Sequence, residues 1–243
     1  MRKRHGSYGF DAPWPLVGLL LGAIVLLALS VISFLLDVSP AGIAFLLGGL
    51  YTLASAVSYL YTTRRGKFVV WAEELKRLKG DERLLDLGCG RGAVLLMAAE
   101  RLEHGRATGI DLWRSKDQSG NAESTARANA EAEGVSDRVE LVTGDMRDLP
   151  FGDDAFDVIV SSLAIHNIPD ADGRAQAVRE AHRVLRPGGL MLIADFQHTD
   201  AYEDTLRSLD VVDVRRRDAG WRFWYGGPWF GTRILEARKP IQR

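Results

Sequence analysis

A glycine-rich turn at residues 84–92, with the sequence Leu-Leu-Asp-Leu-Gly-Cys-Gly-Arg-Gly, constrains the fold of this chain more than any other segment. An apolar run ends near an acidic residue and is followed by three glycines at alternate positions. Glycine lets a backbone turn tightly and approach a ligand without a Cβ in the way. A helix that begins near Ala93 would point its N-terminal amides at that ligand. The pattern therefore predicts a strand, a cofactor loop and a helix.

The glycine spacing alone leaves two cofactors open. Gly88, Gly90 and Ala93 also satisfy the dinucleotide fingerprint, and Asp111 lies at a suitable distance downstream for a ribose contact. Asp86 favours S-adenosylmethionine (SAM), because a carboxylate there can reach the ammonium of a bound amino acid and would repel a pyrophosphate. An unrelated Rossmann-like domain that binds NAD, or no cofactor, is the alternative.

Four further segments follow in the order of a parallel α/β sheet. The apolar pattern predicts strands at residues 108–112, 139–146, 156–162 and 190–196. Asp111 and Asp145 stand near the ends of the first two strands, where their carboxylates can accept hydrogen bonds from ribose hydroxyls and from an adenine amino group. A helix is expected over residues 171–185, and the turn at residues 185–189 leads into the last of these strands.

Together these segments resemble the class I SAM-dependent methyltransferases, especially the small-molecule branch that includes ubiquinone-type and sterol-type methyltransferases. The resemblance rests on the glycine loop, residues 109–112, Gly144-Asp145-Met146, residues 156–168 and residues 185–189, and it covers residues 68–196. It implies a seven-stranded, doubly wound, Rossmann-like α/β sheet with SAM as the cofactor. We expect the cofactor to be held by Asp86, Gly88, Cys89, Gly90, Gly92, Asp111, Leu112, Trp113, Asp145, Met146 and Ser161.

Two histidines follow strand ends on the side where the acceptor should bind. His166 comes after residues 156–162 and His198 after residues 190–196, and ligands of open parallel sheets lie beyond the carboxyl ends of the strands. An imidazole can take a proton from an acceptor near neutral pH. We expect His166 and His198 in the acceptor site, with Tyr225 behind His166. The alternative is that each histidine bonds a backbone carbonyl or caps a helix.

An aromatic segment lies near the C-terminus. Residues 220–231 hold six aromatic side chains, interrupted by glycines and a proline, so they cannot all belong to a core. Flanking strands are expected at residues 211–216 and 232–238, where the fold needs an antiparallel edge. The segment is expected to line an apolar acceptor pocket or to dip into a membrane interface. Alternatively, its aromatic residues only cover the sheet edge.

Two uncharged runs of 21 residues, at 16–36 and 41–61, precede the α/β pattern. As helices each would span about 31 Å, which matches a bilayer core of about 30 Å. The turn at residues 37–40 is long enough only for an antiparallel hairpin. The predicted domains are a transmembrane hairpin (1–65), an amphipathic linker helix (66–79) and a methyltransferase domain (80–243). A cleaved signal peptide for the first run, or two buried core helices, are the alternatives.

Basic residues predict the orientation of the hairpin. They flank its two outer ends and are absent from the connecting turn: Arg2, Lys3, Arg4, Arg64, Arg65 and Lys67. By the positive-inside rule the protein is multi-pass, with both termini and the catalytic domain in the cytoplasm. Gly18 and Gly22, spaced as in Gly-x-x-x-Gly, are candidates for close packing of the two helices.

Composition narrows the function further. The net charge is −1 with mixed signs, which does not indicate a nucleic-acid-binding protein. Cys89 is the sole cysteine, so an internal disulfide framework is excluded, and no metal site is expected. The sequence predicts a membrane-anchored methyltransferase that binds the lipid bilayer and acts on an apolar small-molecule acceptor. The alternatives are a membrane-tethered protein methyltransferase and a SAM-binding scaffold without catalysis.

Overall fold

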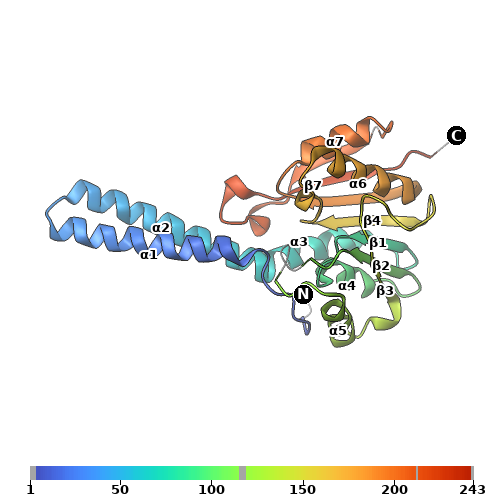
Figure 1. Ribbon diagram of the computed structural model, residues 1–243, viewed down its shortest axis with the longest axis horizontal. Helices are drawn as coiled ribbons and strands as arrows, with labels where there is room; N and C mark the ends of the chain where they lie inside the picture. The colour runs from blue at the N-terminus through green and yellow to red at the C-terminus, as the bar shows by residue number, and fades with distance from the viewer. Residues whose placement is uncertain (1–3, 115–118, 212, 242–243) are drawn as a thin grey trace.

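The computed structural model describes residues 4–114, 119–211 and 213–241, which form an α/β domain and a helical hairpin that projects from it (Figure 1). The strands are β1 (Arg83–Leu87), β2 (Arg106–Asp111), β3 (Val139–Thr143), β4 (Phe156–Ser162), β5 (Leu185–Asp195), β6 (Val214–Asp218) and β7 (Arg233–Arg238). They form one sheet in the order β3-β2-β1-β4-β5-β7-β6, with β7 antiparallel to β5 and β6. The predicted seven-stranded Rossmann-like sheet is confirmed.

The expected strands are present with shifted boundaries, and β5 differs most. It begins at Leu185, which pairs with Phe156, and an irregularity separates this pair from the regular register at Val158. The preceding helix therefore ends at Val184. Pro187 explains the early end, because a proline cannot continue a helix and pushes the residue before it towards extended backbone.

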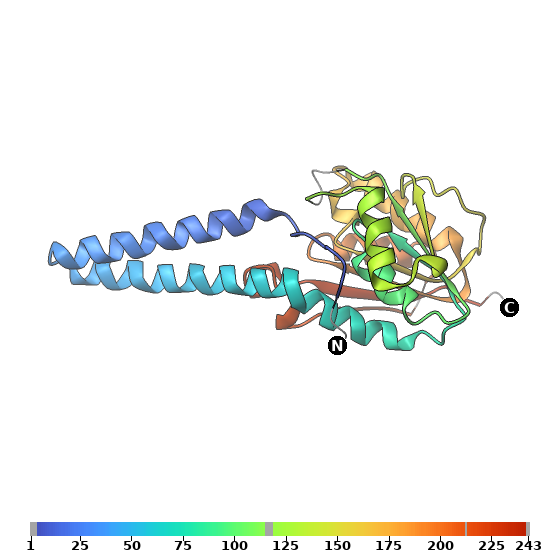
Figure 2. The same ribbon diagram turned by 90° about the horizontal axis from the view of Figure 1, so that it is seen from below.

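Helices cover both faces of the sheet. On one face α3 (Lys67–Glu74), α4 (Ala93–Ala99) and α5 (Glu123–Glu133) bury apolar side chains such as Trp71, Leu95 and Ala130. On the other face α6 (Ala171–Val184) and α7 (Thr199–Arg207) form a second apolar layer. In this doubly wound arrangement β4 points towards the hairpin (Figure 1), which extends from that end of the domain (Figure 2).

The hairpin consists of α1 (Pro13–Leu35) and α2 (Ser39–Tyr61), which run antiparallel. Both helices are long and apolar enough to cross a membrane, and little of either is buried within the protein. Ile24 and Val57, for example, are more than half exposed. A large apolar surface of this kind is uncommon on a monomeric soluble protein and marks an interaction site.

The glycines that allow the two helices to approach lie on α2. A Cβ on Gly42 would come within 2.9 Å of the Phe34 ring, and one on Gly49 within 2.8 Å of the Leu27 side chain. A Cβ on Gly18 would meet no described atom within 4 Å. A Cβ on Gly22 would make an ordinary contact, 3.7 Å, with Cγ2 of Thr52. Gly22 thus faces α2, but neither glycine of the Gly-x-x-x-Gly spacing is required for the close approach of the two helices.

No loop separates the hairpin from the α/β domain. The helix α2 continues through a π-helical turn, η1 (Thr62–Gly66), into α3 and then a 3₁₀ turn, η2 (Leu75–Arg77). The predicted linker helix is thus the end of one long helix that begins in the hairpin. Its apolar stripe is buried as expected, with Trp71 and Leu75 each 1% exposed.

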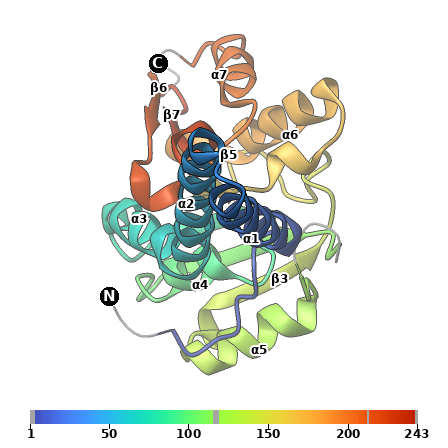
Figure 3. The same ribbon diagram turned by 90° about the vertical axis from the view of Figure 1, so that its left-hand side faces the viewer.

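The first described residues, 4–12, lie against the α/β domain, although the predicted hairpin region began at residue 1. The amides of His5 and Gly6 and the hydroxyl of Tyr8 all donate to Oε1 of Glu133, each over 2.9 Å. Arg4 pairs with Glu100 over 2.6 Å. Figure 3 shows this N-terminal segment crossing the domain towards α5. Arg2 and Lys3 lie outside the described residues.

Residues 221–231, here named the aromatic loop, connect β6 to β7 and lie against the hairpin. The Thr62 hydroxyl donates to the carbonyl of Trp224 over 2.6 Å, and the rings of Tyr61 and Trp221 stack with centroids 5.3 Å apart. Further along the hairpin, the Trp229 indole donates to the Tyr51 hydroxyl over 3.0 Å. The aromatic loop therefore follows α2 well beyond the α/β domain.

Candidate active site

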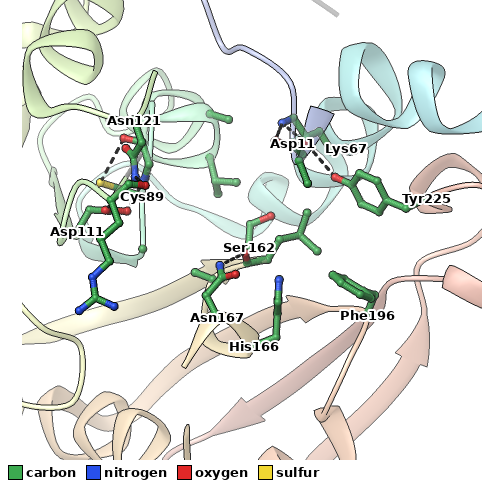
Figure 4. Close-up of a pocket in the computed structure, with 18 of the residues that line it drawn as sticks. Asp11, Lys67, Cys89, Asp111, Asn121, Ser162, His166, Asn167, Phe196 and Tyr225 are labelled. Atoms are coloured by element: carbon green, nitrogen blue, oxygen red, sulfur yellow. Dashed lines mark hydrogen bonds and ion pairs between the residues drawn. The ribbon is translucent and has the colours of Figure 1, made fainter. Parts of the chain in front are cut away.

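A single cavity of about 720 Å³ lies at the carboxyl ends of the central strands and extends to the base of the hairpin. This volume is in the range of small-molecule sites. The cavity lining combines residues of the glycine loop, the acidic residues near the ends of β2 and β3, one of the two histidines, and a tyrosine of the aromatic loop. The expected site residues that line it are Asp86, Gly88, Cys89, Gly90, Asp111, Leu112, Asp145, Met146, His166 and Tyr225. Figure 4 shows part of this lining, with Asp111 and Cys89 on one side and Tyr225 and Phe196 on the other.

The glycine loop forms a tight cradle at one end of the cavity. Gly88 and Gly90 adopt positive φ values of 70° and 51°, which glycine tolerates without strain. A Cβ on Gly88 would lie 2.3 Å from the Cβ of Ala164, so only glycine fits. Gly92 follows at φ 84° as the N-cap of α4. The loop thus exposes backbone to a ligand where any side chain would block it.

Asp86 is buried next to this loop, with 2% of its surface exposed. Burial raises the pKa of its carboxyl to about 7, a backbone hydrogen bond from Leu95 opposes the rise, and the nearby Asp111 adds to it. A cationic group placed beside Asp86 would favour the charged form. The site is therefore suited to a ligand that carries an ammonium.

Asp111 and Asn121 form a hydrogen-bonded pair at the edge of the cavity. Asp111 accepts from the amides of Gly90 (2.9 Å) and Trp113 (2.6 Å) and from Nδ2 of Asn121 (3.2 Å). A carboxylate has about four acceptor positions, so about one is left for a hydroxyl. Oδ1 of Asn121 is buried without a hydrogen-bond partner in the described part of the chain. A buried oxygen without a partner can accept a hydrogen bond from a donor on a ligand.

Asp145 and Met146 line the cavity two and three residues after the end of β3. Asp145 is paired with Arg147 over 2.6 Å, and the Arg147 hydrogen bond holds the pKa of this carboxyl below its usual value. Met146 reaches towards the glycine loop, with its Cε 3.2 Å from the position of a Cβ on Gly88. The two residues can supply an acceptor and an apolar contact to a bound ring.

His166 is held from behind by a buried carboxylate. Its Nδ1 lies 2.8 Å from Oδ1 of Asp195, which is fully buried. The ring of Phe196 packs edge-on against the imidazole with centroids 4.7 Å apart. When Nδ1 carries the proton that bonds Asp195, Nε2 is left as the acceptor. This is the arrangement of an oriented general base.

A polar cluster lines the cavity near the base of the hairpin. Nζ of the buried Lys67 contacts both carboxylate oxygens of Asp11, over 2.7 and 2.8 Å, and the Tyr225 hydroxyl donates to Oδ2 of Asp11 over 2.8 Å. Burial, with Asp11 as the next cause, raises the pKa of Tyr225 well above its ordinary value. Tyr225 therefore acts as a neutral hydrogen-bonding group near neutral pH.

Four of the expected site residues lie outside the cavity lining. Gly92 caps α4, and the Ser161 hydroxyl donates to the carbonyl of Leu87 over 3.0 Å. The Trp113 indole donates to the Thr143 hydroxyl over 2.8 Å. His198 is exposed and starts α7 with φ 58°, because β5 ends three residues earlier and the chain has already turned away. Residues 115–118, shortly after Trp113, lie outside the described residues.

Sequence reasoning did not place five residues of the site: Asp195, Asp11, Lys67, Asn121 and Phe196. Asp195 ends β5 just as Asp111 ends β2, so the rule that picked out the earlier strand-end acid could have found it. Asp11 and Lys67 carry no such signal. They meet only because the N-terminal segment folds back onto the long helix.

Residues 85–193 match the protein family described as "Methyltransferase domain". This match, together with the fold, supports a SAM-dependent methyltransferase domain in this part of the chain. A ubiquinone/menaquinone biosynthesis C-methyltransferase, UbiE, from Roseobacter denitrificans is 36% identical over 118 residues, covering 49% of this chain and 44% of that protein. A sterol 4-C-methyltransferase from Caenorhabditis elegans is 33% identical over 132 residues, covering 54% of this chain and 36% of that protein. The chain spans less than half the length of these relatives.

Solved structures share the fold of the methyltransferase domain. The [4+2]-cyclase SpnF superposes with a TM-score of 0.57 at 22% identity, covering 70% of this chain and 81% of SpnF. The YcgJ protein from Bacillus subtilis gives a TM-score of 0.53 at 17% identity, covering 72% of this chain and 99% of YcgJ. At these identities the likeness concerns the fold alone.

SAM is the cofactor of this methyltransferase domain, and the residues present fit it. The glycine cradle admits no side chain at Gly88. Among the described residues, no cationic side chain lowers the raised pKa of Asp86, and none donates to the buried Oδ1 of Asn121. An amino acid ammonium and an adenosine supply the complementary groups. The expectation of SAM as the cofactor is confirmed.

Proposed function

We propose that this protein is a membrane-anchored methyltransferase that transfers the methyl group of SAM to a lipophilic small-molecule acceptor. One observation carries the proposal. The cavity is lined at one end by Asp86, Gly88 and Asp111 of the cofactor loop and at the other by Gly18 and Leu19 of the apolar hairpin. A site built in this way suits an acceptor with a polar reacting group and an apolar body.

Bound SAM would supply an electrophilic methyl group on a sulfonium. Asp86 would hold the ammonium of its methionine part, and Asp111 would take a ribose hydroxyl. Asn121 and Asp145 would accept from the adenine amino group. These residues act by fixing the donor in position, and positioning alone can supply a large share of the rate of a two-substrate reaction.

His166 would receive the acceptor's proton. Nε2 of His166 would accept the proton that the attacking group loses when it takes up the methyl group. The Asp195 carboxylate keeps the other ring nitrogen protonated and stabilises the imidazolium that results, since their atoms lie 2.8 Å apart. Phe196 holds the ring plane. Asp195 is therefore a positioning residue, and His166 is the catalytic candidate.

The hairpin supports the membrane location. Its outward side chains are apolar over the whole length of α1 and α2, and the basic residues Arg64 and Arg65 are exposed where α2 leaves it. By the positive-inside rule these residues support a cytoplasmic location for the methyltransferase domain. The names of the two relatives, which refer to ubiquinone or menaquinone biosynthesis and to a sterol, support an apolar acceptor.

The direct test is to incubate membranes that contain the full-length protein with methyl-labelled SAM and native lipid extract. Label in the organic phase is the expected result, and a His166→Gln protein that binds SAM normally should not produce it. Label in protein bands alone would favour a protein methyltransferase. Cofactor binding without any transfer would favour a scaffold, as the fold shared with a [4+2]-cyclase shows that this architecture does not dictate methyl transfer.

A further inference from the structure

We propose that the acceptor enters the cavity sideways from the bilayer, through an opening between α1 and the aromatic loop, while SAM enters from water through a separate opening. The proposal rests on the proposed function, because it takes the hairpin to lie in a membrane. It adds a route and a set of residues that select the acceptor by its apolar chain. The opening on the hairpin side, here named the apolar mouth, is formed by Pro15, Gly18, Leu19, Thr52, Gly226 and Phe230.

The apolar mouth is recognised by residues that line the cavity and are also exposed at the surface. Pro15 and Gly18 of α1 are exposed, and Phe230 of the aromatic loop is 55% exposed. No charged side chain belongs to this group. Surroundings of this kind favour contact with hydrocarbon and offer nothing to a polar cofactor.

A second opening lies at the cofactor end and has the opposite character. Arg114, Arg147 and Asn167 line the cavity there and are exposed. Arg147 pairs with Asp145 over 2.6 Å, and Arg114 is close enough to help hold the pKa of Asp145 below its usual value. A charged, water-soluble cofactor matches this polar opening, so the two substrates need not follow one another through the same passage.

The aromatic loop places the apolar mouth within the membrane. The Trp229 indole bonds the hydroxyl of Tyr51, which lies ten residues before the end of α2 at Tyr61, or about 15 Å along the helix. At this position along α2, the Trp229 side chain is 80% exposed. Irregular backbone at membrane depth is tolerated where it packs on protein or lines a cavity. The aromatic loop does both.

Gly18 keeps the apolar mouth open. A Cβ at this position would meet no described atom within 4 Å, although Gly18 lines the cavity. Its helical neighbour Val17 is 43% exposed and does not belong to the lining. A large side chain at residue 18 would therefore project into the passage without disturbing the packing of the hairpin, and the same side chain at residue 17 would point into the bilayer.

The first experiment compares Gly18→Phe with Val17→Phe in membranes, using methyl-labelled SAM and native lipid extract. We expect Gly18→Phe to lower transfer into the organic phase at least tenfold and to raise the apparent KM for the extract, with the Kd for SAM within twofold of wild type. Gly18→Ala should fall between wild type and Gly18→Phe, and Val17→Phe should match wild type. Unchanged transfer by Gly18→Phe overturns the route and leaves the proposed function standing.

The second experiment measures depth without any turnover. Tryptophan emission is recorded in phosphatidylcholine vesicles whose acyl chains carry bromine, for wild type and Trp229→Phe. The emission lost in the variant should be the part quenched by the brominated chains and not by aqueous iodide. Trp113→Phe, which removes an indole on the domain, should remove no bromine-quenched emission.

The outcomes separate the two proposals. If Trp229 is quenched by iodide and not by bromine, the apolar mouth does not open into the bilayer and the route is overturned, even where lipid methylation persists. If wild-type protein places no label in the organic phase, the proposed function fails and the route fails with it.

Discussion

Asp86 is a buried carboxyl group that would bind the ammonium of SAM and that lowers the stability of the cofactor-free protein when it is charged. Because burial raises its pKa from 3.8 to about 7, its contribution to folding is fully present below about pH 4 and is lost as the pH rises to 7. We predict that Asp86→Asn raises the cofactor-free Tm at pH 8 and flattens the decline between pH 4 and 7. Differential scanning calorimetry checks this, with the exposed Asp137→Asn as the control.

The same residue should make SAM binding depend on pH. An ammonium stabilises the charged form of Asp86, so the Kd for SAM should rise as the pH falls below about 7, by up to about tenfold per unit. Asp86→Asn should weaken binding roughly 10- to 100-fold at pH 8, the equivalent of a charged hydrogen bond, and abolish the dependence. Calorimetric titration from pH 5.5 to 8.5 measures both. An unchanged pH profile in the variant would contradict this role.

Asp195 fixes the proton on one nitrogen of His166. We predict that Asp195→Asn lowers kcat by roughly 10²-fold or more, because an amide can present the wrong hydrogen-bonding group to Nδ1 and cannot stabilise the imidazolium. The Kd for SAM should stay within about twofold, and the acid limb of the kcat profile should move. Asp195→Glu should restore part of the rate. A loss confined to KM would show that the pair only shapes the pocket.

At this scale, residues that follow strand ends were predictable and residues joined by tertiary folding were not. Asp86, Asp111 and His166 were placed in the cavity from their positions after apolar strands. The contact between Asp11 and Lys67 joins two segments 56 positions apart, and neither segment has a local sequence pattern that predicts the contact. Trp113 and His198 lie outside the cavity lining, because each has a positive φ, 55° and 58°, that turns the chain after its strand, and the strand pattern does not specify such a turn.

The N-terminal segment is an element without regular structure that depends on one carboxylate. Burial would raise the pKa of Glu133, but the donors from Gly6, Tyr8 and His5, with Arg4 nearby, outweigh it and hold the pKa below its ordinary value. The stability that this docking contributes is therefore present above about pH 4.5 and lost as the pH falls through the lowered pKa. The attachment of residues 4–12 should be the acid-sensitive contact of the domain.

We predict that Glu133→Ala releases this segment while the domain stays folded. Amide hydrogen exchange at His5 and Gly6 should accelerate roughly 10- to 100-fold, since both amides lose a charged acceptor. Glu131→Ala, on the exposed side of the same helix, should leave exchange unchanged. Equal exchange in the Glu133→Ala and wild-type proteins would show that other contacts hold the segment.

For helices and strands, the periodicity of apolar residues predicts which elements exist better than it predicts how they are joined. Two apolar runs and their short turn were enough for the helical hairpin. The join between α2 and α3 was not visible, because a basic stretch around Arg64 and Arg65 resembles the end of a membrane helix and does not prevent the helix from continuing. Contacts from Arg222 and Trp224 of the aromatic loop stabilise that join.

For the whole molecule, the proposed membrane topology can be tested by labelling cysteines introduced at exposed positions. Cys89 is buried, so a cysteine introduced at the exposed Val38 of the hairpin turn would be the reactive one. We predict that Val38→Cys reacts with a membrane-impermeant maleimide in intact cells, because the turn crosses to the outer side. A cysteine at the exposed Ser208 should react only after lysis. Labelling of both positions only after lysis would mean that the hairpin returns to the cytoplasmic side.

The π-helical turn η1 sets the rotational phase between the two halves of the molecule. An α-helix advances about 100° per residue, and a π-turn accommodates an extra residue within a continuing helix. Removing one residue from Thr62–Gly66 would turn the face that carries Phe68 and Trp71 by about 100° relative to the face of α2 that receives the aromatic loop. The two halves of the protein therefore share one continuous helix, and a single-residue deletion in η1 would rotate the active site relative to the membrane proposed for the hairpin.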